Sequence, residues 1–522
     1  MTRILLVLLL GFAVAVTSVE AAKKKRDRRE EGEDEAPSSE LDISREIDLV
    51  IEEYYQSEED YHSASEKLLF LAKNAKKKRD SAKAYYYVGR SLLKLGLVYS
   101  AIPFLIKAIS SDNRHYTPLA LKGLFRISEY LKEDKFLHSA MEELDYDYLP
   151  TESRAEVNYY LGKSYFGDEL YEKAMRKFQK VIAGSHFFSA SLYFRGLIYY
   201  KDGNLQKAAE FFKEILDLEG AEGTLVYDLA ALALGRLYYE LQAFSRAITA
   251  YRLVTKWSSV WHEALFESSW AYFMAGNPQK ALGNLHSVHS PFFDRYFNPE
   301  SYLLKAIIFY SFCWYGDADK SVTDFLQRYT TLSAYISKLQ EVYEQADPQQ
   351  VFLSLSKKAQ SGDQKDEYYK MIFNFILTEK TFSKTVHQID VLERELQADT
   401  TAPDFWQREF FPPIKQQLMK RREAKEKAAG FFVRDFLKKD AMDLKNQINQ
   451  AQIIQLEIKS SEMTRLEEKL RQLGQKTVEK KVKEKDILID VGFEFWPFTG
   501  EYWKDEVGYY IYNIVNICAK QQ

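Results

Sequence analysis

The sequence predicts an all-α protein: a solenoid of helix–turn–helix repeats, followed by a long charged helical segment and a short aromatic tail. Three observations carry this prediction. Glycine (22) and proline (12) are scarce among the 522 residues, which argues against β-rich and collagen-like architectures. Aromatic residues are abundant (36 Tyr, 34 Phe and 7 Trp), which excludes a mostly disordered chain. Small residues also recur at a nearly constant period, as they do in repeat proteins.

The charge balance and the cysteine content exclude several classes of function. The 72 basic and 76 acidic residues give a net charge of −4, so the chain as a whole is not a polycation that would bind nucleic acid. Its two cysteines, Cys313 and Cys518, are too few for a disulfide-rich scaffold or a Cys-rich metal site. Whether the two pair with each other is open from the sequence. We expect no nucleic-acid partner, no metal and no cofactor.

Residues 1–21 have the organisation of a secretory signal peptide. Arg3 precedes an apolar run over residues 4–16, and residues 19–21 place small side chains at the −3 and −1 positions of a cleavage site. The run is shorter than the roughly 20 apolar residues of a spanning helix, so we expect a cleaved signal rather than a retained anchor. No cysteine lies near the cleavage site, which argues against a lipoprotein. No later apolar run is long enough to span a membrane, and N-x-Ser/Thr sequons are absent. We therefore expect a periplasmic or secreted bacterial protein.

Residues 22–45 form a charged linker. Residues 23–29 read KKKRDRR and residues 30–35 read EEGEDE, and neither block can bury apolar surface. The linker is either a solvated spacer or a contact of its basic block with anionic lipid or cell-wall polymer.

Two series of small residues define a repeat solenoid over residues 46–330. Members of the first series are 34, 39, 34, 39 and 34 residues apart: Gly89, Gly123, Gly162, Gly196, Gly235 and Ser269. In most units a member of the second series follows 12 residues later: Ala101, Ala140, Ala174, Ala208, Ala247 and Ala281. We expect two antiparallel helices in each unit, with a small residue wherever their backbones nearly touch.

On these residues the sequence resembles the tetratricopeptide-repeat family. One unit carries the family pattern at Leu161, Gly162, Tyr165, Ala174 and Phe178, and related sets follow at Gly196, Gly235, Leu265 and Phe309. The resemblance implies that the first helix of each unit lines a concave groove for a protein or peptide. The basic/Asn pattern with which some members clamp a C-terminal carboxylate is not reproduced.

The resemblance also indicates which side chains face that groove. They lie three residues before each small residue of the first series, and one and four residues after it. Aromatic residues interrupted by cations occupy these positions, which suits an extended or helical peptide. The predicted binding residues are Tyr86, Arg90, Tyr159, Lys163, Phe166, Tyr193, Tyr200, Arg236, Tyr239, Phe266, Trp270 and Phe273. The alternative is that much of this row is core, packed against the next unit or the C-terminal region.

Beyond residue 330 the repeat pattern fades. Residues 331–411 keep helical periodicity and are divergent repeats or a cap. Residues 412–485 form a long charged helical segment whose apolar residues follow a coiled-coil seam at Leu437, Ala441, Leu444, Ile448 and Ala451. After a slip the seam resumes at Met463, Leu466, Leu470 and Leu473. This favours a helical hairpin or docking on the solenoid over a free dimeric rod, and leaves a homo-oligomer as an alternative.

Residues 486–522 form an aromatic tail. Residues 487–491 read ILIDV, a candidate short strand, and residues 493–503 read FEFWPFTGEYW. A segment this rich in aromatics would be adhesive if exposed, so it either docks on the protein or binds a partner. In the second case the binding residues are Trp496, Phe498, Tyr502 and Trp503. The WPFTGEYW run is similar to C-terminal segments of secreted repeat proteins from gliding and predatory bacteria.

No catalytic signature is found in the sequence: it lacks a Gly-rich phosphate loop, a G-x-S-x-G elbow and a C-x-x-C pair. His286 and His289 lack a third metal ligand and are expected on the surface, and Asp317 and Asp319 fit an inter-helix turn better than a calcium site. The sequence favours an exported non-enzymatic scaffold that binds other envelope proteins, within a machine for motility, secretion or surface assembly. A self-assembling coiled-coil protein is the alternative, and a cell-wall-acting enzyme is a weaker one.

Overall fold

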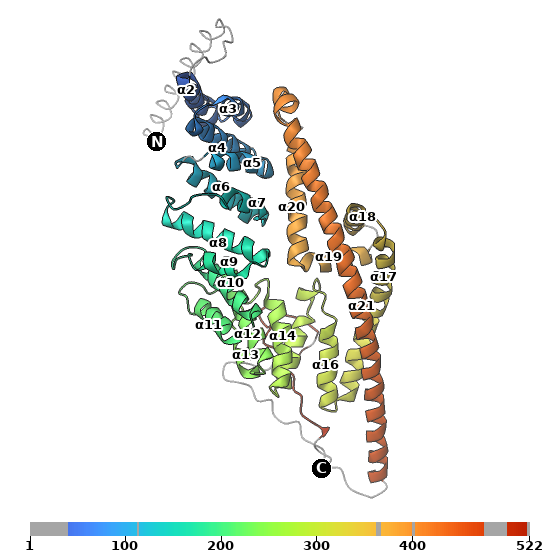
Figure 1. Cartoon of the computed structure of the whole chain (residues 1–522). Helices are drawn as coiled ribbons and strands as arrows, with labels where there is room; N and C mark the ends of the chain where they lie inside the picture. The colour runs from blue at the N-terminus through green and yellow to red at the C-terminus, as the bar shows by residue number, and fades with distance from the viewer. Residues whose placement is uncertain are drawn as a thin grey trace, which may run out of the picture.

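The computed structural model describes residues 40–111, 114–361, 367–398, 402–473, 498 and 500–518. In this part of the chain every regular element is helical, and helices α2–α17 form antiparallel pairs that stack in one column (Figure 1). The predicted all-α repeat fold is confirmed. The signal peptide, residues 22–39 of the linker, the ILIDV segment and Trp496 lie outside the described residues.

The column contains these helix pairs in chain order: α2 (Glu40–Val50), continued by η1 (Ile51–Ser57), with α3 (Tyr61–Asn74); α4 (Lys78–Lys94) with α5 (Val98–Ser110); α6 (Tyr116–Leu131) with α7 (Lys135–Met141); α8 (Thr151–Gly167) with α9 (Tyr171–Phe178); α10 (Phe188–Lys201) with α11 (Leu205–Leu216); α12 (Leu225–Glu240) with α13 (Phe244–Tyr251); α14 (Trp261–Met274) with α15 (Pro278–Val288); and α16 (Glu300–Ser311) with α17 (Tyr315–Glu344). Helix α2 begins inside the predicted linker.

The turn between the two helices of each pair has a common backbone conformation. One residue per turn adopts a left-handed φ: Glu59, Gly96, Lys132, Glu169, Gly203, Gln242, Gly276 and Cys313. Only three of these are glycine, the residue that adopts this conformation without steric cost. The hairpin geometry is therefore kept even in the first and last pairs, where the sequence lacks the small-residue series.

Most glycines of the first series lie where the two helices of a pair are closest, whereas Gly123 faces Leu105 of the preceding pair. A Cβ atom added to Gly162 would lie 2.7 Å from the Phe178 ring, and one added to Gly196 would lie 2.7 Å from the Phe212 ring. Both rings are almost completely buried, so they cannot swing away from an added methyl group. Each glycine thus creates the recess into which an aromatic ring of the second helix packs.

We expect Gly162→Ala to destabilise the protein by about 1–3 kcal/mol, because the methyl group overpacks the contact with Phe178. Gly167→Ala is the matched control on the same helix. Nothing lies within 4 Å of a Cβ atom at Gly167, and alanine favours helix by up to about 1 kcal/mol relative to glycine. Thermal unfolding followed by circular dichroism measures both, and equal midpoints for the two variants would contradict the recess.

After the column the chain turns back along it. Helices α18 (Pro348–Gln360), α19 (Glu367–Thr378) and α20 (Lys380–Gln397) precede η5 (Trp406–Phe410) and the 62-residue α21 (Pro412–Leu473). The middle of α21 packs against α17 and α18, and α20 reaches α5 and α6 (Figure 1). The seam residues Leu437, Leu444 and Ala451 are buried in this contact, whereas Met463, Leu466 and Leu470 are exposed. The first half of the seam is therefore used within the chain.

Helix α20, η5 and the start of α21, which we call the closure strut, bind the first repeats of the column. The Trp406 side chain is fully buried and donates its indole N–H to Ser65 Oγ at 3.2 Å, and Phe410 stacks near Phe104. Lys425 of α21 forms an ion pair with Glu133 at the turn between α6 and α7. The strut, which continues into the rest of α21, thereby connects the first repeats to α17, the last helix of the column, and to α18.

Glu395 of α20 binds the N-terminus of α5. Its carboxylate accepts hydrogen bonds from the backbone N–H of Tyr99 at 2.6 Å and of Ser100 at 3.1 Å, and from Ser100 Oγ at 2.8 Å. These N–H groups have no partner within the first turn of their own helix, so the strut supplies the missing acceptor. Burial raises the pKa of Glu395 to about 7, although these hydrogen bonds favour the charged form.

This pKa predicts how stability depends on pH. Between the ordinary value of 4.5 and about 7, folded Glu395 holds a proton that the unfolded chain releases. Its contribution to the free energy of unfolding is therefore highest below the ordinary value and falls as the pH rises through this window. In Glu395→Gln the group no longer titrates. The unfolding free energy of the wild type minus that of the variant should fall by up to about 3 kcal/mol across the window. Denaturant unfolding at pH values at both ends of this window measures the difference. A difference that stays constant or rises with pH would contradict the raised pKa of Glu395.

Candidate functional site

The predicted inner-face residues divide into a buried and an accessible group. Tyr86 and Tyr159 are buried, and the Tyr159 ring stacks on Phe187 with 4.4 Å between ring centroids, so both belong to the core. The others are exposed or half-buried. The accessible aromatic row, which we call the inner-face row, lies on α8, α10, α12 and α14: Phe166, Tyr193, Tyr200, Tyr239, Phe266, Trp270 and Phe273.

Polar contacts tie successive first helices together along this row. Tyr200 of α10 donates to Glu240 of α12 at 3.0 Å. Arg236 of α12 donates from Nε to both carboxylate oxygens of Glu267 on α14, at 3.0 and 2.9 Å, and from Nη2 to Glu263 at 2.9 Å. The three glutamates were missed by the sequence analysis. The four-residue spacing of Glu263 and Glu267, which puts both on one face of a helix, was the available signal.

The two other predicted cations also have partners within the chain. Arg90 donates to the Tyr86 hydroxyl at 2.9 Å, and Lys163 pairs with Asp134 at 2.6 Å. A partner carboxylate would therefore compete with existing contacts at these positions. The cations of the inner face are thus solvent-accessible but engaged within the chain, so the aromatic side chains are the better candidates for contact with a partner.

A cavity of about 390 Å³ lies away from this row, between α17, α18 and the start of α19. Its polar groups bond one another: Ser354 donates to the Tyr343 hydroxyl at 3.2 Å, and Lys358 donates to the Tyr369 hydroxyl at 2.8 Å. These groups do not converge on a common point, as they do around a bound small molecule. We therefore place the candidate site on the inner-face row.

The tail docks on the column. Residues 504–509 form turns beside α15, and residues 510–517 continue without regular structure to the turn between α16 and α17, with Val507 and Ile514 buried. Backbone and side-chain hydrogen bonds fix this path: Gly508 N–H to Ser287 Oγ, Tyr512 N–H to Gln279 O, Gln279 Nε2 to Ile514 O, Trp314 Nε1 to Val515 O and Ile517 N–H to Phe312 O. A Cβ atom at Gly283 would collide with the Tyr510 carbonyl, so glycine is required beneath the tail.

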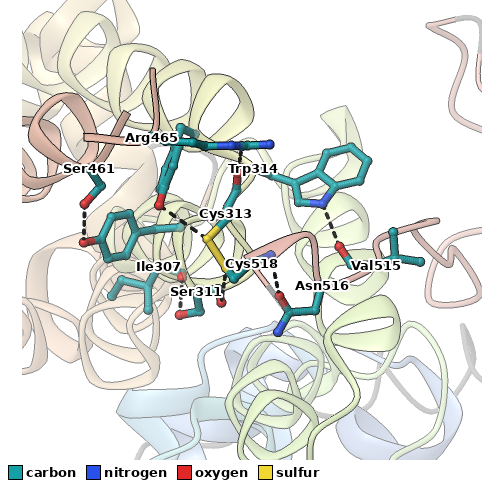
Figure 2. Close-up of a disulfide and its surroundings, with 11 residues drawn as sticks. Ile307, Ser311, Cys313, Trp314, Ser461, Arg465, Val515, Asn516 and Cys518 are labelled. Carbon is teal, nitrogen blue, oxygen red and sulfur yellow. Dashed lines mark hydrogen bonds between the residues drawn. A yellow bond between two sulfur atoms is a disulfide. The ribbon is translucent and has the colours of Figure 1, made fainter. Parts of the chain in front are cut away.

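A disulfide closes the docked tail. Cys518 is bonded to Cys313 in the turn between α16 and α17, with their Cα atoms 5.4 Å apart (Figure 2). Arg465 of α21 donates to the Cys313 carbonyl at 3.1 Å in the same place. The pairing that the sequence left open is therefore formed, and this turn joins the last repeat, α21 and the tail.

The expectation of a surface histidine pair was wrong. His286 is buried, and its ring contacts four aromatic rings of the tail: Phe498, Tyr502, Tyr510 and Tyr512. His289 stacks on Tyr302 at 4.0 Å between centroids. Burial and the charge of Lys305 lower the pKa of His286 to about 4, so it is neutral at pH 7. The tail covers α15, and a segment more than 200 residues away could not be placed there from the sequence.

Comparison with known proteins supports the repeat assignment. Residues 159–222 match the family model described as tetratricopeptide repeat. The column is thus tetratricopeptide-like, and the matched residues run from within α8 to the loop after α11. Among solved structures, the pilF protein of Pseudomonas aeruginosa is 20% identical, with 40% of this chain and 91% of that chain covered and a TM-score of 0.30. A tetratricopeptide repeat protein from Parabacteroides merdae is 17% identical, with 54% and 93% covered and a TM-score of 0.25. No curated protein matches the chain significantly.

Neither overlay is close enough to carry an argument about function. Tetratricopeptide-repeat proteins are in general interaction scaffolds that bind other proteins. Among the described residues, no helix is long and apolar enough to cross a membrane. In the same part of the chain, no three His, Cys, Asp or Glu side chains are grouped as metal ligands.

The paired state of Arg236 gives a test of the inner-face geometry. Arg236→Glu should lower the free energy of unfolding by about 1 kcal/mol, because it replaces a bidentate ion pair with repulsion at a half-exposed site. The exchange Arg236→Glu with Glu267→Arg should recover most of the loss. Chemical denaturation measures all three proteins. If the single variant is as stable as the wild type, the pair does not connect α12 to α14.

Proposed function

We propose that the protein is an exported, non-enzymatic scaffold that binds other cell-envelope proteins along the inner-face row, within a multiprotein machine for motility, secretion or surface assembly. The single observation that carries the proposal is that accessible aromatic side chains recur at equivalent positions on consecutive first helices, α10, α12 and α14. Aromatic residues supply large rigid contact areas and are enriched among the residues that dominate interface energies.

The rest of the structure supports this use of the row. Interhelical bonds from Arg236 and Tyr200 and the closure strut hold the helices in place, so little conformational entropy is lost on binding. The disulfide is of the kind that persists in oxidising compartments, which agrees with the signal-like N-terminus. The protein would then act in the periplasm or outside the cell.

The test is site-specific photo-crosslinking in cells of the source organism. A photoreactive amino acid at Tyr200, which is exposed on the row, should form a covalent adduct with an envelope protein. The same residue at Glu210, exposed on the second helix of that repeat, should not. The adduct should persist in a chain that ends at Lys485, because that truncation removes only the tail.

Binding of the identified partner, once purified, should then weaken at least tenfold in Tyr193→Ala and Trp270→Ala, under conditions where circular dichroism shows both variants folded. An adduct lost on truncation at Lys485 would place binding on the tail. An adduct equal at Tyr200 and Glu210 would contradict the inner-face proposal.

A self-assembling structural protein is the second candidate, because α21 keeps an unused apolar stripe. Leu456, Met463, Leu466 and Leu470 are exposed and spaced by seven, three and four residues, as in a coiled-coil seam. Sedimentation of the purified chain decides between the two. A concentration-dependent dimer abolished by Met463→Glu and Leu470→Glu supports self-assembly, and a monomer at high concentration removes it.

A further inference from the structure

The docked tail does not bury all of its aromatic residues. In the tail Trp503 and Tyr509 stay 56% and 52% exposed, and in the neighbouring loops of the column Trp257 and Phe292 are 40% and 41% exposed. Trp257 lies in the loop between α13 and α14, and Phe292 lies in η2 (Pro291–Phe293), between α15 and α16. Together with Lys256 and Lys504 these four residues form what we call the aromatic platform.

The platform is continuous because tail and loops contact each other. Lys504 lies over the Trp257 ring at 5.2 Å, and Lys256 lies over the Tyr509 ring at 3.9 Å. Lys256 also donates to the Asp505 carbonyl at 3.0 Å, while the ring centroids of Trp257 and Phe292 are 5.6 Å apart. Two repeats and the tail therefore build one surface, which does not exist unless the tail is docked.

The backbone of Trp257 is unusual. Its φ of +65° lies in the left-handed region, which bulky side chains rarely adopt and where glycine would be unstrained. Strain of this kind persists where the surroundings over-determine the conformation, and it clusters at functional sites. The left-handed backbone at Trp257 places its half-exposed indole in the platform.

We propose that the aromatic platform is a second docking surface, for a partner protein that presents apolar side chains flanked by carboxylates. Exposed aromatic residues within a polar border have the anatomy of a protein interface. In the described part of the chain neither Lys256 nor Lys504 is paired with a carboxylate, so no ion pair neutralises either charge, although the Lys256 ammonium also donates to the Asp505 carbonyl. Exposed Glu501 and Asp505 lie on the same tail segment, so the carboxylates of the partner would have to face Lys256 and Lys504.

The proposal goes beyond the scaffold function argued from the inner-face row, and the two can fail separately. The probe is a displayed library of random peptides, panned against the oxidised full chain. Enriched peptides should combine Leu, Phe or Trp with Asp or Glu. Their affinity should fall at least tenfold in Trp257→Ala and in Lys504→Glu, and should weaken with added salt.

Three further variants make the test specific. Gly283→Ala should weaken the same peptides because it removes the seat of the Tyr510 backbone, without altering any platform side chain. Phe70→Ala on α3 and Phe431→Ala on α21, both exposed aromatics outside the two surfaces, should leave the affinity unchanged. Circular dichroism and unfolding midpoints establish that each variant is folded.

Several results would overturn the proposal. They are the absence of enriched peptides, equal binding to Trp257→Ala and the wild type, and loss of binding in Trp270→Ala alone. Platform-dependent binding to anionic phospholipid vesicles in place of peptides would identify a membrane surface instead. Self-association that requires Trp257, detected by light scattering, would identify a second copy of the chain as the occupant.

Discussion

The fold depends above all on the contact between the closure strut and the first repeats. A stack of helix pairs contacts only its neighbours, so its curvature is a sum of small rotations that a weak force can change. Here Glu395 completes the N-terminus of α5, and Trp406 is buried against α3, while α21 continues to α17 and α18. Because the strut links the two ends of the column, the curvature of the stack is fixed and the inner-face row has one arrangement.

The tail adds a second long-range constraint at the other end of the column. Backbone bonds to α15 and the bond between Cys313 and Cys518 attach it to the last two repeats. The same attachment buries His286 and presents Trp503 and Tyr509 to solvent. One side of the tail therefore packs on the protein, and its other side is exposed to solvent. Docking of the tail and binding of a partner to it are compatible.

What the sequence could predict follows the range of the interactions. The contact of Gly162 with Phe178 repeats at a fixed period, so the repeat fold and both helices of most pairs were predictable. The bonds of Arg236 to Glu263 and Glu267 join neighbouring repeats without a periodic pattern, so the cations were assigned to a bound peptide and their partners within the chain were missed. The contacts of Glu395 with α5 and of Cys313 with Cys518 span about 300 and 205 residues, and no local pattern encodes them.

The most direct test of the contact between the closure strut and the first repeats is a distance distribution between spin labels on the strut and on the column. Lys135→Cys on α7 and Thr381→Cys on α20 provide exposed sites, and the two native cysteines are already paired. Labels at Lys122 and Glu210, both within the column, give the width of the distance distribution expected when two sites are rigidly connected. The account predicts one narrow distribution for Lys135 and Thr381, matching that width. A broad or multi-modal distribution would show that the column opens and closes freely, and would contradict it.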